Sequence, residues 1–141
     1  NIWIGSRDGL VLYQRKSNEF FRFNKSSDPF SLGGNIILDI TQDKNGNLLI
    51  GTQEGGLSIL SREQLQKNKP QAFEFQKIVQ GSEDQTLSYR SVQSVFEDRD
   101  RISGWAHMAT EYLLISWTKY LMDSTRSVVR VYPVEQELVL P

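Results

Sequence analysis

ILDITQDKNGNLLIGTQEGGLSIL, residues 37–60, decides the fold, because short apolar runs alternate there with glycine turns. The run at 36–42 is β-branched and largely apolar, and the turn that follows carries Gly46, which can supply the positive φ of a hairpin. A buried strand is expected at 47–52, a tight reversal at Gly55-Gly56, and another strand from residue 57 to 60. The stretch therefore predicts three antiparallel strands joined by tight turns.

The same arrangement occurs elsewhere in the chain. NIWIGSRDG at 1–9 aligns with NLLIGTQEG at 47–55, and ILDITQDKN at 37–45 aligns with VQSVFEDRD at 92–100. Self-similarity at a spacing of about 50 residues is the mark of a repeat architecture. The chain is therefore expected to be a series of similar units.

Each unit is completed by a fourth, outer strand. Residues 73–78 alternate at first between apolar and polar, as a half-exposed outer strand does, and they match residues 21–23 of the first unit. The second unit is longer because 62–70, REQLQKNKP, is polar and mildly helical where the first unit has only the connection at 14–18.

Four short strands per unit and glycine turns at fixed places predict an all-β fold of four-stranded antiparallel β-propeller blades in an incomplete ring. The linkers DPFSL at 28–32 and DQTL at 84–87 both join the outer strand of one blade to the inner strand of the next. We expect propeller repeats over 1–100, comprising a partial blade at 1–25, a full blade at 36–80 and the start of a third at 91–100, and then an atypical tail at 101–141.

These residues resemble two-component regulator propeller repeats. The likeness is carried by NIWIGSRDGL at 1–10, DKNGNLLIGT at 43–52 and the linker at 28–32, and it covers about residues 1–100, with Leu49 where the family usually has Trp. In that family such repeats build the periplasmic sensor of hybrid two-component proteins, which continue into a membrane helix and a histidine kinase. Many members sense oligosaccharides.

The resemblance implies that this chain is a fragment of an extracytoplasmic ligand-sensing propeller that responds to carbohydrate. It also implies a periplasmic location within an inner-membrane protein. The partners expected are an oligosaccharide ligand, the remaining blades of the full-length protein and a second copy in a homodimer. The alternatives left open are the propeller of an enzyme, a protein-interaction scaffold and a non-functional remnant of a frameshifted gene.

Charge, cysteine content and hydropathy exclude several kinds of partner and site. The 141 residues carry 16 Lys and Arg against 17 Asp and Glu, a net charge of −1, so nothing indicates nucleic-acid binding. There is no cysteine, which excludes disulfides and thiolate chemistry, and no apolar run approaches the roughly 20 residues that span a bilayer. Because the chain begins inside a predicted strand without an initiator Met, we expect it to be a fragment.

The repeated residues have structural interpretations. Trp3 is interpreted as a packing residue between blades, with a sugar-stacking platform as the lesser alternative. Gly5 and Gly51 are expected to permit close strand approach. An acidic set could in principle suit a hard cation, but it lacks the ligand series of a calcium loop and is interpreted as turn chemistry. The set comprises Asp43, Asn45, Asp98 and Asp100.

No residue is predicted to be catalytic, to bind a cofactor or to hold a metal, and no ligand-binding residue is identified. His107 is the only histidine, and no phosphate-binding glycine loop or Gly-x-Ser-x-Gly motif is present. We therefore expect no enzyme activity from this chain alone.

The repeat breaks at EDRDRISGWAHMATEY, residues 97–112. After Asp100 the pattern requires a string such as Asn-Ile-Trp-Ile-Gly-Thr. Reading the codons one register off permits Asn-Ile-Trp-Leu-Gly-Thr-Tyr-Gly-Asn-Gly-Ile, and the first glycine is forced by the codons of Trp105 and Ala106. The hypothesis is a one-base deletion near codon 101, which places Trp105 and His107 last among functional candidates. The alternative is a C-terminal helix or hairpin that caps the sheet.

The nucleotide sequence tests this hypothesis. We expect the shifted frame after codon 100 to encode the Asn-Ile-Trp-Leu-Gly string and to remain open. Sequencing the gene checks both expectations, and an early stop codon in the shifted frame would rule the hypothesis out.

Overall fold

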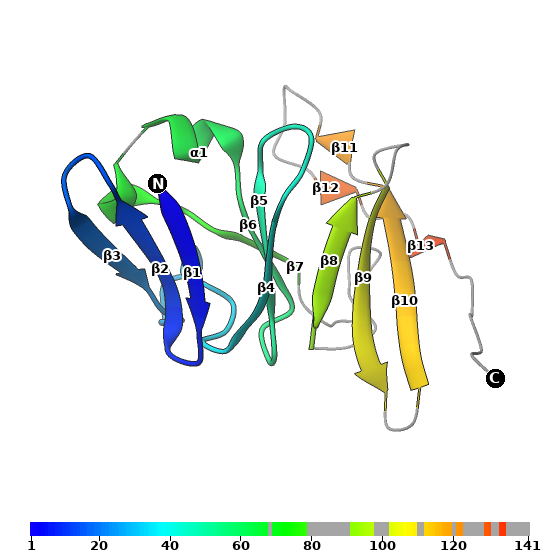
Figure 1. Cartoon of the computed structure of the whole chain (residues 1–141). Helices are drawn as coiled ribbons and strands as arrows, with labels where there is room; N and C mark the ends of the chain where they lie inside the picture. Colours follow the sequence, from blue (N-terminus) through cyan, green and yellow to red (C-terminus); the bar gives the residue numbers. More distant parts are fainter. Residues whose placement is uncertain are drawn as a thin grey trace.

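The computed structural model describes residues 1–67, 69–78 and 91–97, together with the strands between 102 and 134. Three antiparallel sheets stand side by side as successive blades (Figure 1). No helix among the described residues has the length and apolar character needed to cross a bilayer. The strands of the first two blades are β1 (Ile2–Ser6), β2 (Gly9–Gln14) and β3 (Glu19–Phe23), then β4 (Ile37–Gln42), β5 (Leu48–Thr52), β6 (Leu57–Leu60) and β7 (Gln76–Ile78).

Strands that follow one another in the sequence are neighbours in the first two sheets, whose orders are β1-β2-β3 and β4-β5-β6-β7. The third sheet has the order β8-β9-β10-β13, and β11 pairs with β12 separately. As far as the chain is described, the sheets do not close into a ring, so the fold is the predicted incomplete propeller of antiparallel blades. The remaining strands are β8 (Ser94–Glu97), β9 (Ile102–Ala109), β10 (Tyr112–Lys119), β11 (Leu121–Met122), β12 (Val129–Arg130) and β13 (Pro133–Val134).

The central strand β5 is buried on both faces. Leu48 and Ile50 belong to an apolar cluster with Leu10 of the first blade. Leu49 points the other way and belongs to a second cluster with Val92, which precedes β8. Successive strand residues face opposite sides of a sheet, so the unbroken Leu-Leu-Ile run supplies two cores at once, one toward each neighbouring blade.

Glycines allow the blades to approach closely. A Cβ atom on Gly5 would lie 2.7 Å from Cγ2 of Ile37, where the second blade begins. A Cβ atom on Gly51 would lie 2.6 Å from the carbonyl oxygen of Val92. Both distances are too short for real atoms, so the predicted role of the two glycines is confirmed.

Trp3 lies between the first and second blades, as predicted. Its half-buried ring packs on the cluster that contains Leu10 and Ile50. The ring centroid is 5.9 Å from that of Phe23 and 6.4 Å from that of Phe73, which belongs to the second blade. The aromatic group therefore joins the outer parts of the two blades.

The predicted outer strand at 73–78 is only partly correct, because β7 covers Gln76–Ile78 alone. The preceding chain forms the expected helical insertion, α1 (Arg62–Lys67), and then a 3-10 turn (Pro70–Ala72). The N–H of Phe75 donates to the carbonyl of Phe30 in the linker at 2.8 Å, and the Phe75 side chain is buried in the core. This bond to the linker explains why Phe75 lies outside the strand.

The third sheet continues past residue 100. Glu97 pairs with Ser103, and in the second blade Gln42 pairs with Leu48 at the same separation in the sequence. Residues 102–109 therefore occupy the position of the strand whose sequence pattern is missing, and β10 forms a hairpin with it. The β9–β10 hairpin extends the third sheet and does not cap it. The reading-frame hypothesis and the boundary at 100 stay predictions.

The substitution Gly51→Ala should lower the free energy of unfolding by about 1–3 kcal/mol, the usual range for overpacking. Its added methyl group would meet the backbone carbonyl of Val92, which cannot move without its strand. That of Gly5→Ala would meet Cγ2 and Cβ of Ile37, a stiff β-branched side chain, so Gly5→Ala should also destabilise the protein, but less than Gly51→Ala. Chemical denaturation of both variants checks this ranking. A Gly51→Ala protein as stable as the parent would contradict the close approach of the blades.

Candidate functional site

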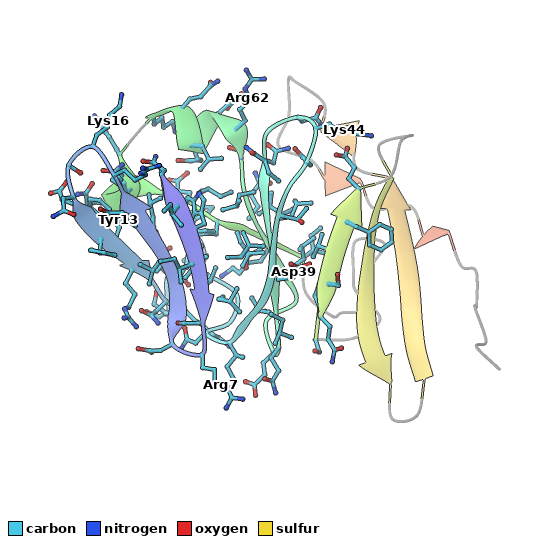
Figure 2. The ribbon with its side chains drawn as sticks, viewed as in Figure 1. Arg7, Tyr13, Lys16, Asp39, Lys44 and Arg62 are labelled. Carbon is cyan, nitrogen blue, oxygen red and sulfur yellow. The ribbon has the colours of Figure 1, made fainter. Side chains whose placement is uncertain are left out.

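Loops gather at both ends of the blades (Figure 2). One end, marked by Arg7 at the bottom of the view, carries the β1–β2 and β5–β6 turns and the linker 24–36. We call it the linker end. The opposite end, marked by Lys44 and Arg62, carries the β4–β5 turn and α1. Because turns from successive blades lie together at each end, a ligand there can contact more than one blade.

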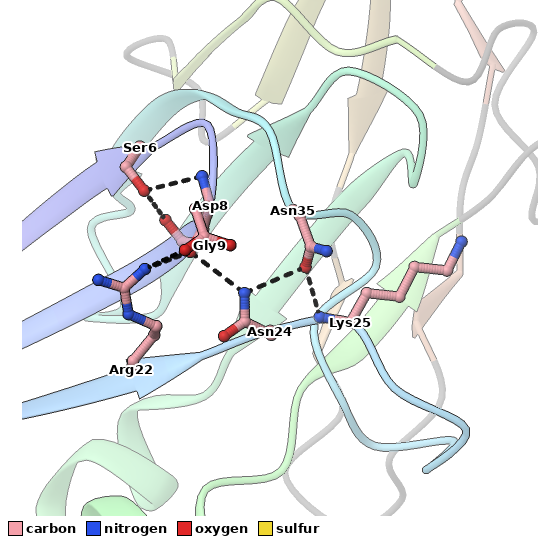
Figure 3. Close-up of polar contacts among 7 residues, drawn as sticks. All are labelled: Ser6, Asp8, Gly9, Arg22, Asn24, Lys25 and Asn35. Atoms are coloured by element: carbon pink, nitrogen blue, oxygen red, sulfur yellow. Dashed lines mark hydrogen bonds and ion pairs between the residues drawn. The ribbon is translucent and has the colours of Figure 1, made fainter.

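A polar network organises the linker end (Figure 3). Arg22 Nη1 lies 2.5 Å from Asp8 Oδ2 and donates to the Asp8 carbonyl at 2.9 Å. Asn24 Nδ2 donates to the same carbonyl and, at 3.4 Å, to Asn35 Oδ1. The Gly9 N–H donates to the Asn35 carbonyl at 2.7 Å. The network therefore ties the β1–β2 turn to the linker that leads into the second blade.

This network is exposed, so its energy is small. The side chains of Arg22 and Asp8 are 53% and 80% exposed. An ion pair at such a surface contributes about 0–1 kcal/mol. The network serves to position loop residues at the linker end more than to stabilise the fold.

The β1–β2 and β5–β6 turns differ in length, but a side-chain hydroxyl closes each of them with the same pair of hydrogen bonds. Ser6 Oγ donates to the Gly9 carbonyl at 2.9 Å, and Thr52 Oγ1 donates to the Gly56 carbonyl at 2.9 Å. Each hydroxyl also accepts an N–H from inside its turn, at 3.0 Å in both cases. The sequence alignment matches Gly9 with Gly55, but in the structure Gly9 corresponds to Gly56.

Carboxylates join the innermost strands of the second and third blades. Asp39 Oδ2 accepts the Val95 N–H at 2.7 Å and the Ser94 hydroxyl at 3.2 Å. In return, Glu97 Oε2 accepts the Lys44 N–H at 2.6 Å. Figure 2 shows Asp39 between the two blades. Each blade therefore offers a carboxylate to the backbone of its neighbour, which fixes the inner strands relative to each other.

Asp39 is not among the residues singled out from the sequence, although a signal was available. It lies in the otherwise apolar run Ile37–Ile40, where a carboxylate requires hydrogen-bond donors. The partner donors lie 55 and 56 residues away and could not be identified before the blades were placed.

The acidic residues predicted to form turns do so where they are described. Asp43 Oδ1 accepts the Asn47 N–H at 2.8 Å, and Asp43 Oδ2 accepts from Asn47 Nδ2 at 2.7 Å. Asn45 is exposed in the same turn, in which Gly46 has a φ of 89°. Asp98 and Asp100 lie outside the described residues. Within the described part of the chain, no group of three acidic or histidine side chains could hold a metal ion.

Trp105 and His107 both lie in β9, which pairs with β8 and β10. Only the backbone of this strand is described, so their roles stay predictions, as does the expected lack of enzyme activity. The described side chains form hydrogen bonds between the second and third blades, and they place exposed polar groups at the linker end. This arrangement suits binding by hydrogen bonds.

Replacing Asp39 by Asn should lower the free energy of unfolding by about 1–3 kcal/mol, because an amide cannot accept at both of its terminal atoms. Oδ1 and Oδ2 of Asp39 both accept backbone N–H groups, from Ile40 and Val95. The matched control is Asp8→Asn in the exposed network, for which about 0–1 kcal/mol is expected. Urea denaturation measures both, and equal effects would contradict the inter-blade role of Asp39.

Comparison with known proteins agrees with this architecture. A profile of the two-component regulator propeller family matches residues 31–54, which hold the last part of the linker, β4 and β5 and end within the β5–β6 turn. The comparison with curated proteins gives no match. Among solved structures, the extracellular domain of a hybrid two-component system from B. thetaiotaomicron is similar, with a TM-score of 0.54 and 30% sequence identity.

The similarity to that solved structure covers 74% of this chain and 12% of the other. The matched profile includes the Asp43 turn and Gly51, which are the features on which the repeat alignment depends. Repeat spacing, sheet order and both comparisons agree: the chain is a propeller segment that contains a two-component regulator propeller repeat at residues 31–54.

Proposed function

We propose that this chain is part of the extracytoplasmic sensor of a hybrid two-component signalling protein, and that the sensor binds an oligosaccharide. The sensor would lie in the periplasm, and the rest of the protein would contain a membrane helix and a histidine kinase. The observation that carries the proposal is the 30% identity to the extracellular domain of a hybrid two-component system. The propeller repeat at 31–54 supports the same signalling class.

The linker end is the proposed ligand surface. It presents exposed donors and acceptors, among them the carboxylate of Asp8 and the guanidinium of Arg22. Arg7 is exposed beside them at the tip of the β1–β2 turn and takes no part in the network of Figure 3. Hydroxyl-rich sugars bind through hydrogen bonds to such groups, and a free guanidinium supplies several donors.

The output of the sensor would be conformational. A ligand that contacts turns from two blades favours the blade arrangement to which it binds most tightly. Asp39 and Glu97 hold the inner strands of neighbouring blades by hydrogen bonds, so a small change between blades would be shared along the propeller.

Calorimetric titration of the complete extracellular domain with neutral oligosaccharides tests the proposal. We expect Arg7→Ala to weaken binding about tenfold or more, because a hydrogen bond from a charged donor contributes about 1.5–3 kcal/mol. The matched control is Arg15→Ala, since Arg15 is equally exposed but follows β2 at the opposite end of the same sheet. It should leave the affinity unchanged.

Failure of the complete domain to bind any oligosaccharide would remove the carbohydrate assignment. If oligosaccharides bind but Arg15→Ala weakens binding and Arg7→Ala does not, the ligand sits at the other end of the blades.

A further inference from the structure

Three segments of the chain meet at the linker end, between the second and third blades (Figure 1). The Val92 N–H donates to the Thr52 carbonyl at 2.9 Å, and the Gln53 N–H donates to the Ile36 carbonyl at 3.0 Å. The start of β4, the β5–β6 turn and the chain that leads into β8 are therefore adjacent. We call this place the junction, and it comprises residues 36–39, 52–54 and 92–94.

The backbone at the junction is closely packed. A Cβ atom on Gly55 would overlap the carbonyl group of Gly33, so the β5–β6 turn rests directly on the linker. Thr52 closes this turn with its hydroxyl, and a Cβ atom on Gly34 would lie 3.0 Å from that hydroxyl oxygen. The turn therefore projects its exposed side chains from a fixed backbone, which lowers the entropy lost when a ligand binds.

Leu38 is turned toward solvent by an irregularity in β4. The register of β4 against β5 shifts between Ile37 and Asp39, so Leu38 is an extra residue without a partner in β5. Extra residues of this kind re-aim a side chain, and they are common next to functional sites. Leu38 is 40% exposed, although the residues on either side of it are half-buried. It therefore provides a small apolar surface at the junction.

Two exposed glutamines accompany this apolar surface. Gln93 occupies the position of Leu38 in the repeat, so the two residues lie at the same level of neighbouring inner strands. Gln53 projects from the β5–β6 turn. Within the described part of the chain, neither glutamine side chain makes a hydrogen bond. Each amide has two donor hydrogens and an acceptor oxygen, so it can bind a hydroxyl group in either sense.

We propose that the junction is a binding subsite for one neutral sugar ring, an inference that rests on the oligosaccharide function proposed above. The C–H groups on one face of the ring lie on Leu38. Hydroxyl groups at the edge of the ring bind the amides of Gln53 and Gln93. An apolar contact with a few placed polar groups around it is the usual composition of a small-molecule site.

The charge of the junction favours a neutral ring over an acidic one. Glu54 is exposed beside Gln53 in the turn, and Asp39 is half-buried beside Leu38. Residues 36–39, 52–54 and 92–94 include no Lys, Arg or His. A uronate or sulfated ring would therefore meet like charge without a cation to offset it, and such repulsion excludes the wrong partner.

A ring bound at the junction contacts two blades. Gln93 directly precedes β8 of the third blade, whereas Leu38 and Gln53 belong to the second. The Asp39 carboxylate, next to Leu38, accepts the Val95 N–H across the same boundary. The ligand therefore bridges blades whose inner strands are hydrogen-bonded at that point, and it favours the spacing between them to which it binds most tightly.

Calorimetric titration of the complete extracellular domain tests the subsite. The neutral probes are linear hexasaccharides of glucose, xylose, mannose and galactose, and hexagalacturonate is the acidic probe. Gln93→Ala removes one amide of the junction. Gln66→Ala is the matched control, because Gln66 is also an exposed glutamine but lies on α1 at the opposite end. Both positions are exposed, so thermal melting should show that both variants are folded.

We expect Gln93→Ala and Leu38→Asn each to weaken binding of a neutral hexasaccharide about threefold to tenfold, the loss that corresponds to one hydrogen bond or a small apolar contact. Gln66→Ala should leave the affinity unchanged. Hexagalacturonate should bind about tenfold more weakly than the best neutral probe, and Glu54→Gln should reduce that difference.

One result separates this inference from the proposed function. If a neutral hexasaccharide binds and both Gln93→Ala and Leu38→Asn retain the parent affinity, the subsite is overturned and the oligosaccharide function stands. Tighter binding of hexagalacturonate than of every neutral probe, or equal losses for Gln66→Ala and Gln93→Ala, would also overturn the subsite. If no probe binds the parent domain, the carbohydrate function fails and the subsite fails with it.

Discussion

Burial of the central blade on both faces is the constraint on which the rest of the structure depends. A sheet that faces water on one side can alternate apolar and polar residues, but β5 lies between two other sheets and cannot. Its side chains are therefore apolar or hydrogen-bonded at every position, with Thr52 bonded within its turn. Stability in this arrangement comes from neighbours on both sides, so no blade is an independent folding unit.

Two further features follow from packing sheets face to face. The blades must approach closely at one end, which requires glycine opposite Ile37 and opposite Val92. Their backbones must also remain hydrogen-bonded where the inner strands meet, and the Asp39 carboxylate meets this need. Apolar contact supplies most of the energy, while the directional bonds set how one blade is placed against the next.

Local patterns were sufficient to predict the strands, the turns and their order. The run 48–52, the turn glycine at 46 and the recurrence of both at a fixed spacing depend only on neighbouring residues. The partial error at 73–78 arose because Phe75 bonds to the linker, a contact over 45 residues that alternation cannot reveal. Asp39 was missed for the same reason. The strand at 102–109 shows that a sheet edge can recruit a segment whose own repeat signature is absent.

The hydroxyl-closed turns have a consequence for how this protein can change over time. Ser6 closes its turn on the third residue after it and Thr52 on the fourth, with the same pair of bonds. An inserted residue is thus absorbed inside the turn, and the strands on either side keep their alignment. Evolution can lengthen or vary these loops while the interior stays intact, so new recognition properties can arise without a new scaffold.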